Sequence, residues 1–167
     1  MYASVRKDAE IARLLVEHGA RVNDIDGASW AAIHYACIKG SLEIAKILNQ
    51  YGADLNLKNG NGYTPLIYAV LSRNKELVEY LLISNVKINE QDNLGGTALI
   101  NAITLNDEDM AEILISYGAD PSLRDRNNQT AYSYAYAHGM DRTLKRLLSL
   151  SLNGGIKPLD NEEQSPK

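Results

Sequence analysis

The sequence contains no phenylalanine, only one cysteine and four prolines, and no long hydrophobic run. The single thiol, Cys37, excludes an internal disulfide, which fits a reducing environment among others. No stretch approaches the roughly 20 apolar residues of a membrane span, and residues 1–10 lack the basic-then-apolar order of a secretory signal. We therefore expect no membrane insertion and a location in the cytoplasm or another soluble intracellular compartment.

Positive charge is also scarce. The chain has 17 Lys and Arg against 21 Asp and Glu, which gives a formal net charge of −4. Nucleic-acid binding depends mainly on clustered basic side chains that release counterions from phosphates, so we expect no nucleic-acid partner. Hydrophobic residues make up 45% of the chain and charged residues 23%, which is ordinary for a globular protein.

A period of 33 residues runs through the chain. Asn23, Asn56, Asn89 and Ser122 stand at this interval, and each opens a new unit. A fixed period of this length predicts a repeat array in which each unit packs only on its neighbours. We expect one domain over residues 1–150, with units at about 1–22, 23–55, 56–88, 89–121 and 122–150. The polar residues 151–167, which include two prolines and three acidic residues, are expected to form a mobile tail.

The third unit shows how one repeat should fold. Residues 59–62, Asn-Gly-Asn-Gly, have the composition of a tight turn, because glycine and asparagine tolerate positive φ. Thr64 and Pro65 then fit the cap and first position of a helix. Apolar residues follow at helical spacing over 66–70 and again over 77–82. Each unit is therefore predicted to be a turn followed by two helices.

The segments Gly62-Tyr63-Thr64-Pro65-Leu66-Ile67-Tyr68-Ala69 and Tyr51-Gly52-Ala53-Asp54-Leu55-Asn56 resemble the ankyrin repeat, which carries T-P-L-H-x-A at this period. The resemblance implies an all-α solenoid of stacked helix-turn-helix units joined by β-turn or hairpin loops. About five repeats are expected, with the first incomplete, because the period projected backwards reaches Met1 within a helix. The first unit is then either a minimal cap or the start of an excised piece of a longer array. The aligned framework columns include Ala36, Ala69, Ala102 and Ala135, and Leu15, Leu48, Leu81, Leu114 and Leu147.

Several positions depart from the family pattern. The second unit lacks both Thr and Pro at its helix start, which leaves Ser29 as the candidate cap. Only His34 fills the histidine column. Arg73 stands where a left-handed residue is expected, so we predict a locally weaker repeat there. Thr143 and Arg146 replace apolar residues in the last unit, and we expect them on the outer side of a C-terminal cap.

A binding surface is expected where equivalent positions form columns. The first-helix positions opposite the core carry an apolar stripe, and the turn columns carry aromatic and Arg side chains of the types enriched at binding hot spots. By resemblance, ankyrin repeats bind proteins through turn tips and first-helix positions on the concave face. Trp30 and Tyr63 could equally lie over neighbouring turns as packing residues. The candidate partner-binding residues are Val5, Arg6, Trp30, Ile38, Lys39, Tyr63, Leu71, Leu94, Leu105, Arg126, Gln129 and His138.

Catalytic signals are weak. His18, His34 and His138 fall in three different columns, without acidic residues or cysteine at metal-ligand spacing. We expect no catalytic site, metal or cofactor. The turn column Asp26, Asn59, Asp92 and Asp125 is interpreted as accepting local backbone N–H groups. The column Tyr2, Tyr35, Tyr68, Asn101 and Tyr134 is interpreted as mainly structural.

The sequence therefore predicts a non-catalytic module that binds another protein as a scaffold, an inhibitor or a targeting element. The alternative is a regulatory or spacer fragment of a larger ankyrin-containing enzyme, channel or effector. A third possibility, an enzyme that uses a small molecule or a metal, predicts a thermal shift with common nucleotides or metals. We expect a monomer, with weak self-association through the N-terminal end as a further possibility.

Overall fold

The structure is a computed structural model that describes residues 1–152. The expected mobile tail lies, from residue 153 onward, outside the described residues. Within residues 1–152 there are ten helices and no strand. The helices are α1 (Tyr2–Arg6), α2 (Ala9–Glu17), α3 (Ala32–Ile38), α4 (Leu42–Gln50), α5 (Pro65–Leu71), α6 (Lys75–Ile83), α7 (Ala98–Thr104), α8 (Glu108–Ser116), α9 (Ala131–Ala137) and α10 (Asp141–Leu152).

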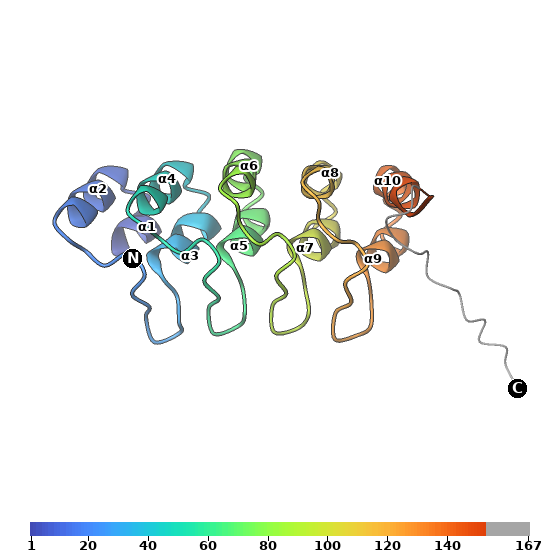
Figure 1. Ribbon diagram of the computed structural model, residues 1–167, viewed down its shortest axis with the longest axis horizontal. Coiled ribbons are helices and arrows are strands. Elements are labelled where there is room, and N and C mark those ends of the chain that lie inside the picture. The colour runs from blue at the N-terminus through green and yellow to red at the C-terminus, as the bar shows by residue number, and fades with distance from the viewer. Residues whose placement is uncertain (153–167) are drawn as a thin grey trace, which may run out of the picture.

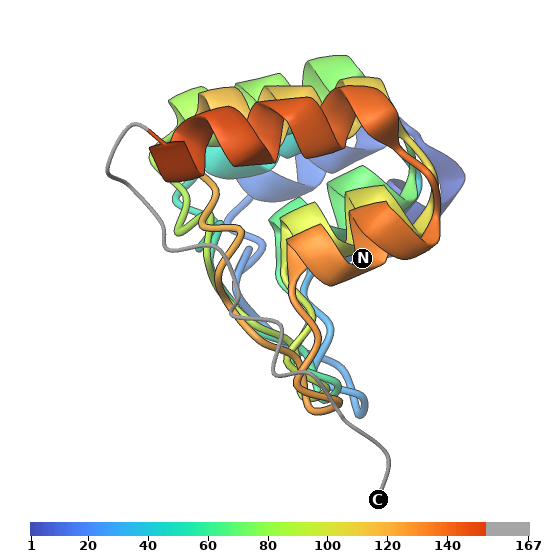
Figure 2. The same cartoon turned by 90° about the vertical axis from the view of Figure 1, so that its right-hand side faces the viewer.

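The helices are arranged as pairs stacked side by side in chain order (Figure 1). The first helices of the pairs form one row, the second helices form another, and hairpin-like loops project from the helical layers (Figure 2). The main contacts join the two helices of one pair or equivalent helices of adjacent pairs, such as α3 with α5 and α8 with α10. The all-α repeat architecture predicted from the period is thereby confirmed.

Side-chain caps explain where most helices begin. The Thr64 hydroxyl accepts a 3.3 Å hydrogen bond from Ile67 N–H, and Pro65 occupies the next position, where no backbone donor is needed. The same threonine cap recurs at Thr97 and Thr130. Three of the second helices begin in a similar way. The side-chain oxygens of Asp8, Asn74 and Asp107 each accept a hydrogen bond from the backbone N–H three residues later.

The second unit begins its helix differently from the expectation, and the proposed Ser29 cap is wrong. Ser29 has φ 62°, a left-handed conformation that forms part of the hairpin. Ala31 is the N-cap of α3, and its N–H donates a 3.0 Å hydrogen bond to His34 Nδ1. His34 Nε2 lies 2.8 Å from the Leu57 carbonyl oxygen, so the neutral ring donates there. Burial lowers the pKa of His34, which favours this neutral form.

The core follows the alanine and leucine columns, with one exception. Ala36, Ala69 and Ala102 are completely buried, which lets the first helices of adjacent units approach closely. Leu48 and its equivalents in later units are also buried, but Leu15 is exposed. The prediction that Leu15 belongs to the buried framework is therefore wrong, because its column depends on a preceding helix pair for cover.

The polar residues of the last unit also lie elsewhere than expected. Thr143 is completely buried, and its backbone N–H lies 3.5 Å from Oε1 of Glu108 on α8. Arg146 Nε lies 3.9 Å from Oε2 of Glu112, also on α8. Both residues face the preceding unit, so the prediction that they cover the outer side of the array is wrong.

Several inter-helix turns adopt left-handed backbone without glycine. Lys7 and Arg73 have φ 58° and 55°, close to the 65° of Gly40 at the equivalent position. Left-handed backbone costs a residue with a Cβ atom about 1 kcal/mol. Arg73 Nη2 donates a 2.8 Å hydrogen bond to the Leu105 carbonyl of the next unit, which offsets part of this strain. That Arg73 marks a weaker repeat stays a prediction.

Candidate protein-binding surface

The hairpin tips of adjacent units are joined by backbone hydrogen bonds. Gly60 N–H donates to the Ala28 carbonyl at 3.1 Å, and Arg126 N–H donates to the Leu94 carbonyl at 2.9 Å. An equivalent 3.0 Å bond runs from Asn93 N–H to the Asn61 carbonyl. The tips form one aligned row that projects from the helical layers (Figure 2). Side chains at equivalent tip positions are therefore held in a fixed register.

Each hairpin is closed by its Asp or Asn side chain. In the second unit, Asp26 Oδ1 accepts hydrogen bonds of 2.9 Å from the N–H groups of both Ala28 and Trp30. The same pair of bonds recurs in each later unit, at Asn59, Asp92 and Asp125. The interpretation of this column as local backbone acceptors is confirmed.

The tyrosine column ties the first helices to these hairpins. The Tyr35 hydroxyl donates a 2.5 Å hydrogen bond to Asp26 Oδ2, which raises the pKa of Tyr35 and lowers the pKa of Asp26. Asn59 Nδ2 donates to the Tyr68 hydroxyl at 2.8 Å, and in the last unit Tyr134 bonds to Asp125. These bonds support the structural interpretation of the column.

Trp30 lies at the centre of an aromatic cluster. Its ring centroid is 4.9 Å from that of Tyr35 in its own unit and 4.5 Å from that of Tyr68 in the next unit. Tyr63 packs edge-on against Tyr68 at 5.2 Å. Trp30 and Tyr63 are half-buried, so each contributes to packing between units and also presents part of its side chain outward. The packing interpretation of these residues is therefore supported, and their part in binding stays a prediction.

The apolar stripe along the first helices is less exposed than expected. Val5 is exposed, but Ile38, Leu71 and Leu105 are half-buried and pack against the core. They lie at the last position or C-cap of their helices, beside a charged or polar neighbour in each unit. The stripe is a shallow apolar band, and its part in binding stays a prediction.

The other candidate residues are at the surface. Leu94 is 64% exposed at the third hairpin, although it is large and apolar. Arg126 and Gln129 are exposed at the last hairpin. Arg6, Lys39 and His138 are exposed at the C-terminal ends of first helices. The candidate set thus divides into a hairpin-tip row, Trp30, Tyr63, Leu94, Arg126 and Gln129, and a helix-end row, Val5, Arg6, Ile38, Lys39, Leu71, Leu105 and His138.

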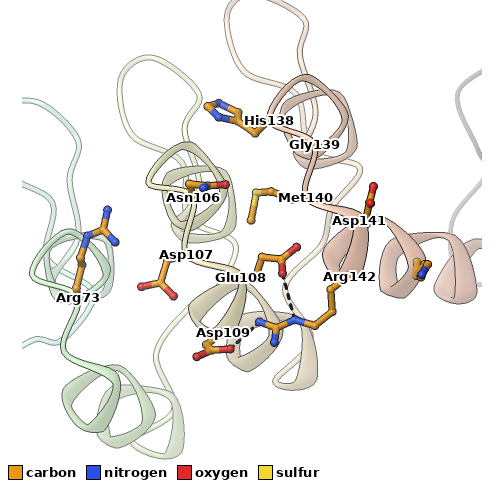
Figure 3. A pocket seen from close by; sticks show the side chains of 11 residues that line it. Arg73, Asn106, Asp107, Glu108, Asp109, His138, Gly139, Met140, Asp141 and Arg142 are labelled. Atoms are coloured by element: carbon orange, nitrogen blue, oxygen red, sulfur yellow. Dashed lines mark hydrogen bonds and ion pairs between the residues drawn. The ribbon is translucent and has the colours of Figure 1, made fainter.

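A polar groove of about 840 Å³ lies beside the helix-end row, between the inter-helix turns of the last three units. Figure 3 shows Arg142 on this surface bonded to two acidic side chains of α8. Its Nη2 lies 2.6 Å from Asp109 Oδ1 and its Nε lies 3.4 Å from Glu108 Oε2. Asp107 caps α8 by accepting from Met110 N–H. Because these acidic groups already have partners, the groove is a paired ionic surface with His138 at its edge.

Two of the histidines bond to nearby backbone groups, and the one cysteine is buried. His18 Nδ1 lies 2.7 Å from the Leu14 carbonyl oxygen on its own helix, and His34 belongs to the helix start described above. Cys37 is completely buried, and burial raises the pKa of its thiol. Among the described residues no group of three or more His, Cys, Asp or Glu could hold a metal ion. No helix in the same part of the chain is long and apolar enough to cross a membrane.

The candidate residues from the sequence omit several exposed apolar residues of the end units, among them Ile11, Leu14 and Tyr136. Ile11 and Leu14 lie on α2, and Tyr136 lies on α9. Their columns are apolar in the inner units, so composition alone gives no reason to separate them from the core. The signal available in the sequence was their position in the first and last units.

Comparison with known families identifies the repeat. A family model described as ankyrin repeats, in three copies, matches residues 1–92 and again residues 74–160. The two matches together span nearly the whole chain. A comparison with curated proteins finds no match.

Proposed function

Because the chain belongs to the ankyrin repeat family, whose repeats generally bind other proteins, we propose that it binds a protein partner through the hairpin-tip row and the helix-end row. Binding is non-catalytic and serves a scaffolding, inhibitory or targeting role. The observation that carries the proposal is the row of hairpins joined tip to tip, because it presents Trp30, Tyr63 and Leu94 in a fixed register.

A pre-ordered surface favours binding because little conformational entropy remains to be lost. The backbone bonds between tips hold the loops, and the Tyr35–Asp26 bond holds the hairpin against α3. Half-buried aromatic side chains in such a surface can bury further area against a partner without first becoming ordered. Leu94 adds an apolar side chain that contacts little of its own protein. A specific interface needs roughly 1,200–2,000 Å² of total buried area, which two parallel rows of side chains can supply.

The proposal is tested by comparing two matched triple variants in affinity capture with quantitative mass spectrometry. The binding-surface variant carries Lys39→Ala, Leu94→Ala and Arg126→Ala, all at exposed positions. The control variant carries Tyr51→Ala, Ile83→Ala and Tyr117→Ala, which are exposed at the ends of second helices. Circular dichroism establishes that both variants fold.

We expect the proteins captured specifically by the wild type to be lost with the binding-surface variant and retained with the control. A second binding-surface variant, Trp30→Ala with Ile38→Ala and Leu71→Ala, should also lose them if it folds. If both binding-surface variants retained every protein that the wild type captures specifically, the site assignment would be wrong. If the wild type captured none, the alternative of a regulatory or spacer segment of a larger protein would be favoured.

A further inference from the structure

Contacts between second helices define two opposite sides of each helix. Asn49 Nδ2 on α4 donates a 2.8 Å hydrogen bond to the Tyr80 hydroxyl on α6. Lys46 Nζ on α4 lies 5.8 Å from the centre of the same tyrosine ring. The equivalent position to Tyr80 in the last unit is Arg146, which pairs with Glu112 of the preceding helix. In each second helix, the column that contains Tyr80 and Arg146 therefore faces backward, toward the preceding helix. The columns that contain Lys46 and Asn49 face forward, toward the following helix.

The backward-facing side of α2 is apolar and uncovered. Ile11, Leu14 and Leu15 are 49%, 50% and 48% exposed. Their equivalents on α4, in the same order, are Ile44, Ile47 and Leu48, which are 0%, 1% and 3% exposed. The residue types match, so the difference comes only from the helix pair that covers α4. We call Glu10, Ile11, Leu14 and Leu15 the leading face.

The last unit exposes the complementary side. Leu148 on α10 is 41% exposed, whereas Ile115 at the same position of α8 is 5% exposed. Tyr136 on α9 is 73% exposed, whereas its equivalent Ile103 is completely buried. We call Tyr136, Leu144, Lys145 and Leu148 the trailing face.

Both faces are apolar, and one pair of charges across them is complementary, while Asp141, at the position of Lys75 and Glu108, would also lie near Glu10 and repel it. Within the array, Arg13 Nη2 on α2 lies 3.3 Å from Glu43 Oε1 on α4. Lys145 occupies the position of Arg13 in the last unit, and Glu10 occupies the position of Glu43 in the first. A second copy that continued the stack would place Lys145 against Glu10 as Arg13 lies against Glu43. Leu148 would meet Leu14, as Asn49 meets Tyr80.

We propose that two copies of this chain associate head to tail, with the trailing face of one copy docked on the leading face of the next. The contact repeats the packing between neighbouring units of the array, and it leaves the hairpin-tip and helix-end rows of both copies free. Such an arrangement is heterologous and does not close, so further copies can add. No hairpin precedes α1 in the described chain, so the contact lacks tip-to-tip backbone bonds, and we expect weak association.

Sedimentation velocity of the full chain over a range of concentrations tests this contact. The weight-average mass of the wild type is expected to rise above the 18.4 kDa of the monomer as concentration increases. Leu14→Glu and Leu148→Glu should each abolish the rise, because each places a carboxylate in one of the two apolar faces. An equimolar mixture of these variants should form one-to-one dimers and nothing larger, since each retains one functional face. Ile83→Glu, at a more exposed apolar position on α6, is the control and should behave as the wild type.

Charge exchange provides an independent check. Lys145→Glu should weaken association several-fold, and adding Glu10→Lys to the same chain should restore it. Wild-type protein that stayed monomeric at every concentration would overturn the proposal and would favour a different protein as the occupant of the leading face. Association that survived Leu148→Glu but not Leu14→Glu would also overturn it, because it would indicate head-to-head pairing. Two monomeric variants that formed no mixed dimer would contradict it as well.

Discussion

The Tyr35 hydroxyl donates a 2.5 Å hydrogen bond to Asp26 Oδ2 and so joins α3 to the hairpin that precedes it. Tyr134 and Asp125 are related in the same way at 2.6 Å. The bond lowers the pKa of Asp26 below its ordinary value of about 3.8. For Asp125, burial raises the pKa, but the bond from Tyr134 and further hydrogen bonds outweigh it, so the net pKa is also lowered.

These carboxylates predict acid sensitivity. A group whose pKa is lowered in the folded state adds stability above its unfolded pKa, and that stability is lost as pH falls through the folded pKa. The free energy of unfolding should therefore decrease below about pH 4. Tyr35→Phe with Tyr134→Phe should be less stable than the wild type at pH 6, and its stability should fall less on acidification. Urea unfolding followed by circular dichroism from pH 6 to pH 3 measures both effects. Tyr51→Phe, at an exposed position, is the control, and parallel acid curves for all three proteins would contradict the prediction.

Thr143 predicts a stabilising substitution. Its side chain is completely buried in a column where the inner units have Ile44, Leu77 and Met110, and its hydroxyl has no hydrogen-bond partner among the described residues. A buried unsatisfied hydroxyl costs about 1–3 kcal/mol, and valine has nearly the same shape. Thr143→Val should therefore increase the free energy of unfolding by about 1 kcal/mol in urea denaturation.

The matched control is another buried threonine. Thr130 Oγ1 accepts a 3.2 Å hydrogen bond from Ser133 N–H at the start of α9. Loss of an N-cap costs about 0.5–2 kcal/mol, so Thr130→Val should destabilise. Destabilisation by both substitutions to a similar extent would indicate that the Thr143 hydroxyl has a partner.

Two glycines with the same backbone conformation should respond differently to alanine. Gly52 and Gly62 have φ 81° and 80°. A Cβ atom at Gly52 would meet nothing within 4 Å, whereas one at Gly62 would lie 2.6 Å from Asn93 N in the next hairpin. Gly52→Ala should cost about 1 kcal/mol for the left-handed conformation alone. Gly62→Ala should cost about 1–3 kcal/mol more, because the next hairpin must move.

Thermal or urea denaturation of the two alanine variants measures this difference. Equal losses of stability would show that neighbouring hairpins can move apart at little cost in free energy. That result would weaken the claim that the hairpin-tip row presents side chains in fixed register. A larger loss for Gly62→Ala would support the rigidity on which the proposed binding surface depends.

The period of 33 residues predicted most of the fold, because equivalent residues in a repeat array meet equivalent neighbours. The columns of Ala69 and Leu81 were therefore assigned correctly. Leu15 and Thr143 were not, because a column shows which side of a helix a residue occupies but does not show whether a neighbouring unit covers that side. The half-burial of Ile38 and Leu71 could not be predicted either, since it depends on how closely adjacent first helices pack.

The aromatic cluster was only partly predictable. Tyr35 and Asp26 stand nine residues apart, and so do Tyr134 and Asp125, which is a regularity visible in the sequence. The contact between Trp30 and Tyr68 joins two units, and its 4.5 Å separation depends on the stacking geometry. The sequence therefore indicated the residue types of the candidate surface but not which of them also hold the units together.

Site-specific photo-cross-linking tests most directly whether the hairpin-tip row contacts the partner. A photoreactive benzoylphenylalanine is placed at Leu94 in one protein and at Ile83 in a second, two apolar positions that are 64% and 70% exposed. On irradiation in cell lysate, we expect a discrete cross-linked product from position 94 and none from position 83. A product from position 83 alone, or the same product from both positions, would contradict the proposed binding surface.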